Sequence, residues 1–150
     1  MIAFLVLAAG GLLALEVASR NYQAELRALR PGDVISITLE ISSSGDRVEL
    51  TEEERAELLR LLTSATRMSP NHPSGVWTCY VRIRAKSRDH EFRMSATGNN
   101  GTVVWLFSNG SDGWNLGTLR NDGFRPFVER VAARYWGRPL RPGSLSPEKP

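Results

Sequence analysis

The stretch VWTCYVRIRAK, residues 76–86, sets the fold, because apolar and polar side chains alternate along it. Its odd-numbered residues, from Trp77 to Ala85, are apolar or small. Its even-numbered residues from Thr78 onward are polar, aromatic or charged: Thr78, Tyr80, Arg82, Arg84 and Lys86. A period of two is typical of a strand with one buried and one solvated face. The stretch therefore predicts a strand that carries a row of cations on its outer side.

Three further strands are predicted between this stretch and Leu119. HEFRMSAT, residues 90–97, continues the apolar face through Phe92 and Met94. TVVWLFS, residues 102–108, is apolar on both faces, which favours a central position in the sheet. WNLGTL, residues 114–119, is the last strand. The intervening segments are rich in Gly and Asn, which tolerate the positive φ angles of tight hairpins.

The chain before this meander predicts two more strands and a helix. DVISITLEI, residues 33–41, has four residues expected to face inward: Ile35, Ile37, Leu39 and Ile41. Residues 48–50 form a short return strand. Thr51 then opens a helix, since Thr51 and Glu54 have the spacing of a capping box. After the meander, Asp122 is expected to cap a helix over FRPFVERVAARYW, residues 124–136.

The predicted fold is an α+β domain over residues 33–136, with the element order β-β-α-β-β-β-β-α. It combines an antiparallel sheet of about six strands with two helices on one face, preceded by an N-terminal hydrophobic helix. Residues 137–150 are rich in proline and lack an apolar period, which predicts a disordered tail.

Residues 1–19 contain no charge between Ile2 and Leu15, and three interpretations compete for them. A single-pass membrane anchor is favoured over a cleaved signal peptide or a buried helix, although the apolar run is short for a span. The side of the membrane on which the domain lies stays open. Residues 20–32 are expected to form a helical linker. Its apolar stripe, through Leu15, Tyr22, Leu26 and Leu29, could pack on the domain or pair two anchored chains, and packing on the domain is favoured because two short heptads make a poor coiled coil.

No motif for catalysis, phosphate binding or dinucleotide binding is present. A single cysteine, Cys79, excludes an intramolecular disulfide framework and a cysteine metal cluster, and we expect neither cofactor nor metal. A small hydrolase-like enzyme would have to assemble its site from distant residues such as His72, His90 and Asp112. This enzyme is kept as an alternative.

The leading prediction is a membrane-tethered binding module without a catalytic constellation. It would bind an unidentified protein or anionic ligand on the open sheet face or in the concavity between sheet and helices. The candidate binding residues are Tyr80, Arg82, Arg84, Lys86, Arg93 and Trp114. A basic, partly aromatic face could also bind an anionic polymer or nucleic acid, but the net charge of +3 is low for a dedicated nucleic-acid binder.

Overall fold

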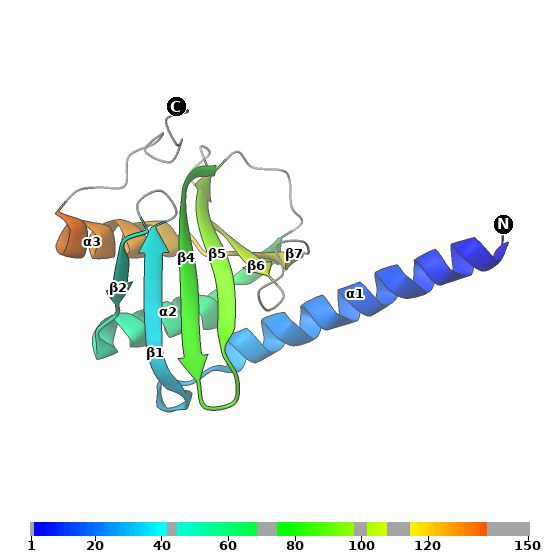
Figure 1. Ribbon diagram of the computed structural model, residues 1–150, viewed down its shortest axis with the longest axis horizontal. Helices are drawn as coiled ribbons and strands as arrows, with labels where there is room; N and C mark the ends of the chain where they lie inside the picture. Colours follow the sequence, from blue (N-terminus) through cyan, green and yellow to red (C-terminus); the bar gives the residue numbers. More distant parts are fainter. Residues whose placement is uncertain (1, 42–44, 69–74, 98–101, 108–114, 138–150) are drawn as a thin grey trace.

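The computed structural model describes residues 2–41, 45–68, 75–97, 102–107 and 115–137. These residues form three α-helices, one 3₁₀ turn and seven strands (Figure 1). The helices are α1 (Ile2–Ala28), α2 (Glu52–Ser64) and α3 (Phe124–Trp136), and the 3₁₀ turn is Pro31–Asp33. The strands are β1 (Val34–Ile41), β2 (Arg47–Glu49), β3 (Thr66–Met68), β4 (Gly75–Ala85), β5 (His90–Thr97), β6 (Thr102–Phe107) and β7 (Asn115–Arg120). The predicted tail lies outside the described residues from residue 138 onward.

The strands form one antiparallel sheet in the order β2-β1-β4-β5-β6-β7-β3. The α+β class and the antiparallel pairing are therefore confirmed, but the sheet has seven strands where about six were predicted. The additional strand is β3, which pairs with β7 at the sheet edge through Thr66↔Arg120 and Met68↔Thr118. A strand of three residues is too short to show an alternation that could be recognised in the sequence.

The alternation in β4 is confirmed, because Cys79, Val81 and Ile83 are all buried. Their neighbours across the sheet are apolar as well. Val81 pairs with Leu39 of β1, and Ile83 pairs with Ile37. Matched apolar residues on adjacent strands fix the register, since a shift by one residue would move each apolar side chain to the wrong face.

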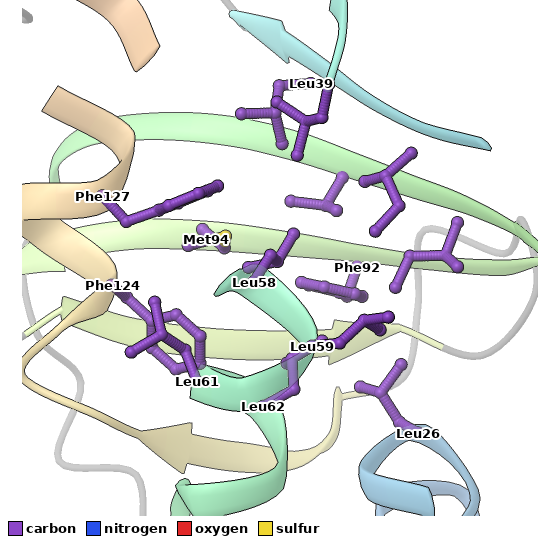
Figure 2. Packing of buried hydrophobic residues seen from close by; sticks show 14 of the residues in the cluster. Leu26, Leu39, Leu58, Leu59, Leu61, Leu62, Phe92, Met94, Phe124 and Phe127 are labelled. Atoms are coloured by element: carbon purple, nitrogen blue, oxygen red, sulfur yellow. The ribbon is translucent and has the colours of Figure 1, made fainter. Parts of the chain in front are cut away.

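All three helices contribute to one core on the same side of the sheet (Figure 2). Leu58 and Leu62 of α2 and Phe127 of α3 lie over the buried face of the strands. The C-terminal half of α1 adds Tyr22 and Leu26, which confirms that its apolar stripe packs on the domain. Tyr22, Leu26 and Leu29 of the predicted helical linker therefore lie in the core cluster.

The start of α2 is confirmed, and the predicted cap of α3 is wrong. The Glu54 backbone N–H donates to Thr51 Oγ1 at 3.3 Å, and the Thr51 N–H donates to Glu54 Oε2 at 3.0 Å. At α3, the N-cap residue is Gly123, which has no side-chain cap, and the side chain that contacts its N–H belongs to Asn121. Its Oδ1 accepts from the Gly123 N–H at 2.8 Å, while its Nδ2 donates to the Leu61 carbonyl of α2 at 2.9 Å. Asn121 therefore joins the two helices, which an isolated capping signal cannot reveal.

The membrane-anchor prediction for residues 1–19 is corrected by the structure. Among the described residues, no helix is both long and apolar enough to cross a bilayer. The apolar run of α1 stops at Glu16, whose carboxylate pairs with Arg67 of β3 at 2.7 Å and with Arg20 at 3.0 Å. The run from Ile2 to Leu15 rises only about 21 Å, against about 30 Å for the hydrocarbon core. The N-terminal end of α1 extends away from the sheet (Figure 1).

Candidate functional site

The candidate site lies on the face of the sheet opposite the helices. Arg82, Arg84 and Lys86 are exposed, whereas Ile83 and Ala85 between them are buried in the core. Because successive residues on one face of a strand are about 6.7 Å apart, Arg82 and Arg84 form a row at the end of β4, and Lys86 follows it directly after the strand ends at Ala85. The pleat of β4 thus positions the row, and the core behind it holds the strand in place.

The cations in this row differ in their ionic partners. Arg82 pairs with Glu91 of β5 at 3.2 Å. Glu40 of β1, which could have neutralised a second cation, pairs instead with Arg47 of β2 at 2.7 Å. Within the described part of the chain, Arg84 and Lys86 have no carboxylate at ion-pair distance. The uncompensated charge of the row is therefore concentrated at the β4 end next to the turn into β5.

The other predicted binding residues contribute less to this site. Tyr80 pairs with Arg93 in the register of β4 and β5, and both side chains are half-buried. Arg93 already interacts within the fold and is not a free cation. Trp114 lies outside the described residues. The structure therefore brings Arg82, Arg84 and Lys86 together as one exposed group, with Tyr80 at its end.

Of the three residues named for the alternative enzyme, the structure describes only His90. His72 and Asp112 lie outside the described residues. His90 is fully buried, and neither of its ring nitrogens has a hydrogen-bond partner among the described residues. Burial lowers the pKa of His90 and favours the neutral imidazole. A fully buried side chain cannot contact a substrate that arrives from solvent.

The surroundings of His90 form a contact between α1 and the β4–β5 hairpin that sequence reasoning missed. The Tyr22 ring lies against the imidazole, with 5.6 Å between the ring centroids. The Arg88 guanidinium lies 5.3 Å from the centre of the Tyr22 ring and also pairs with Glu25. His90 Nε2 is 4.0 Å from Glu25 Oε1. The apolar stripe of α1 was the only signal for this contact in the sequence, and of the residues in the contact the stripe includes only Tyr22.

Metal ligands and the single thiol are the remaining groups of chemical interest among the described residues. No three His, Cys, Asp or Glu side chains converge among them. Burial raises the pKa of Cys79 to about 12, so its thiol stays protonated at neutral pH. Comparisons of the chain with protein families, curated proteins and solved structures give no match.

Proposed function

We propose that this protein is a non-enzymatic binding module whose helix-free sheet face binds an anionic partner. The observation that carries the proposal is the pair of exposed cations at the end of β4. Arg84 and Lys86 lack a carboxylate partner within the described residues, while other arginines of this face, such as Arg82 and Arg47, are paired. Cations that the fold does not use are available to an external anion.

The position of the helices supports the same proposal. The described helices cover the opposite face of the sheet, so none of them occupies the row on β4 (Figure 1). Exposed charges separated by more than a Debye length, about 8 Å at physiological salt, interact weakly. Neighbouring cations about 6.7 Å apart act on one bound anion together. A partner with several negative charges would therefore gain most from the row.

The test compares two arginines that differ only in location. Arg84→Ala removes an exposed cation from the candidate face, and Arg60→Ala removes an exposed cation from α2 on the other side of the sheet. Each variant and the double variant Arg84→Ala with Lys86→Ala would be run on a heparin column, and binding to poly-L-glutamate would be titrated at several salt concentrations.

We expect Arg84→Ala to elute at lower salt than Arg60→Ala, and the double variant to elute at lower salt still. Circular dichroism of each variant confirms that the fold is intact. Elution of Arg84→Ala and the double variant together with Arg60→Ala would show that only net charge matters and would refute the proposal.

A further inference from the structure

A β-bulge in β1 leaves one apolar side chain exposed, next in sequence to the residue that pairs with Arg84. Val34 pairs with Ala85 and Ser36 with Arg84, so Ile35 is an extra residue with no partner on β4. The prediction that Ile35 faces inward is therefore wrong, and its side chain is 54% exposed. Val34 and Ile37 on either side of the bulge are buried. Bulges are known to redirect side chains in this way.

Hydrogen bonds on both sides of the strand hold the bulge in place. Arg55 of α2 donates from Nη1 to the Ile35 carbonyl at 2.6 Å. On the β4 side, the Lys86 N–H donates to the Asp33 carbonyl at 2.9 Å. The exposure of Ile35 is therefore a feature of an ordered backbone. The other exposed large apolar residues among those described lie on helices: Leu13, Val17 and Tyr135.

We propose that Ile35, Arg84 and Lys86 together form a docking surface for an acidic peptide segment that carries an apolar side chain. The inference rests on the proposed function and adds the class of partner. Carboxylates at alternate positions of an extended peptide repeat at about 6.7 Å, and Arg84 and Lys86 also occupy alternate positions, one in β4 and the other directly after the strand ends at Ala85. An apolar side chain of the same peptide would cover Ile35 and remove its exposed surface from water.

The composition of the surface favours a peptide over a single-stranded nucleic acid. Nucleic acids bind through aromatic platforms on which bases stack, in addition to cations. Ile35 is aliphatic and offers no such platform. Tyr80, the nearest aromatic residue in the row, is half-buried and lies toward the opposite end from Lys86. Cations with an adjacent aliphatic residue fit a peptide that combines negative charge with an apolar side chain.

The test uses two labelled peptides that differ in one feature. In the first, glutamates alternate with glycines around central leucines, and in the second, serines replace the leucines. Affinities for the full chain are measured by fluorescence anisotropy at several salt concentrations. We expect the leucine peptide to bind about tenfold more tightly than the serine peptide, and both affinities to fall as salt rises.

Ile35→Thr keeps a β-branched side chain in the strand but removes most of the apolar contact. We expect this variant to reduce the advantage of the leucine peptide to about twofold or less. Ile35→Val should retain a larger advantage, which separates an apolar contact from a damaged fold. Val17→Thr is the matched control, because Val17 is similarly exposed on α1. It should leave the advantage unchanged.

The outcomes separate this inference from the proposed function. The docking surface is refuted if Ile35→Thr still binds the leucine peptide about tenfold more tightly, or if the wild type binds the two peptides equally. In either case, peptide binding that is weakened by Arg84→Ala would still support the proposed function. Tighter binding of oligo-dT than of either peptide, unchanged in Ile35→Thr, would also refute the acidic peptide and leave an anionic partner. If no probe responds to Arg84→Ala with Lys86→Ala, both proposals fail.

Discussion

Leu26→Ala tests whether the C-terminal half of α1 belongs to the cooperative unit of the domain. Leu26 is 1% exposed and is part of the core that includes α2 and the sheet. The substitution removes three carbon atoms from the core. At about 0.8 kcal/mol for each, the lost transfer free energy is about 2.4 kcal/mol. The cavity left behind raises the expected loss of unfolding free energy to about 3–5 kcal/mol.

The loss would be measured by urea unfolding monitored by circular dichroism, as a lower midpoint with an unchanged slope. Alanine is the better helix former, so the result cannot be attributed to helix propensity. Leu13→Ala is the control, because Leu13 is 67% exposed on the same helix, and the expected change is below about 0.5 kcal/mol. Equal midpoints for Leu26→Ala and Leu13→Ala would refute the docking of α1 on the core.

Three further predictions concern Cys79, His90 and Gly123. Cys79 is buried and its pKa is raised to about 12, so iodoacetamide at mildly alkaline pH should label it only after urea unfolding. Labelling would be followed by mass spectrometry, and fast labelling of the native protein would contradict this prediction. Burial lowers the pKa of His90, so the stability that neutral His90 contributes is present above its unfolded pKa of about 6.5 and is lost as pH falls through the lower folded value. Urea midpoints should therefore fall more steeply between about pH 7 and pH 5 in wild type than in His90→Leu, and parallel profiles would show that His90 has no such role. In Gly123→Ala the new Cβ would lie 2.5 Å from Leu61 Cδ2, so thermal unfolding should show a loss of about 1–3 kcal/mol, whereas Gly32→Ala, with open space around it, should cause none.

The long alternating strand was predictable because its signal is local. Each residue of β4 from Cys79 to Ala85 reports its own face through its polarity, and the burial pattern follows. The capping box at Thr51 was predictable for the same reason, since both partners lie within four residues of each other. The exposed row of Arg82, Arg84 and Lys86 is a consequence of this alternation and needs no knowledge of the other strands.

Features that depend on pairing between distant segments could not be predicted. The bulge at Ile35 exists because β1 and β4 differ by one residue in register, and the sequence of β1 alone alternates through it. β3 is a strand only because β7 lies beside it. Asn121, not Asp122, accepts from the Gly123 N–H at the start of α3, and its amide also donates to the Leu61 carbonyl of α2 at 2.9 Å. In each case a tertiary contact overrides the local signal.

The domain has a helix layer and a sheet layer, and α2 contacts the sheet both in the core and at its edge. Leu58 and Leu62 of α2 fill the core behind the sheet, and Arg55 of the same helix donates to the Ile35 carbonyl at the sheet edge. The hydrogen bond satisfies a backbone acceptor that β2 does not reach, since β2 pairs with β1 only from Thr38 to Glu40. The helix layer therefore holds the backbone at the irregular point of β1, next to the surface for which we propose binding.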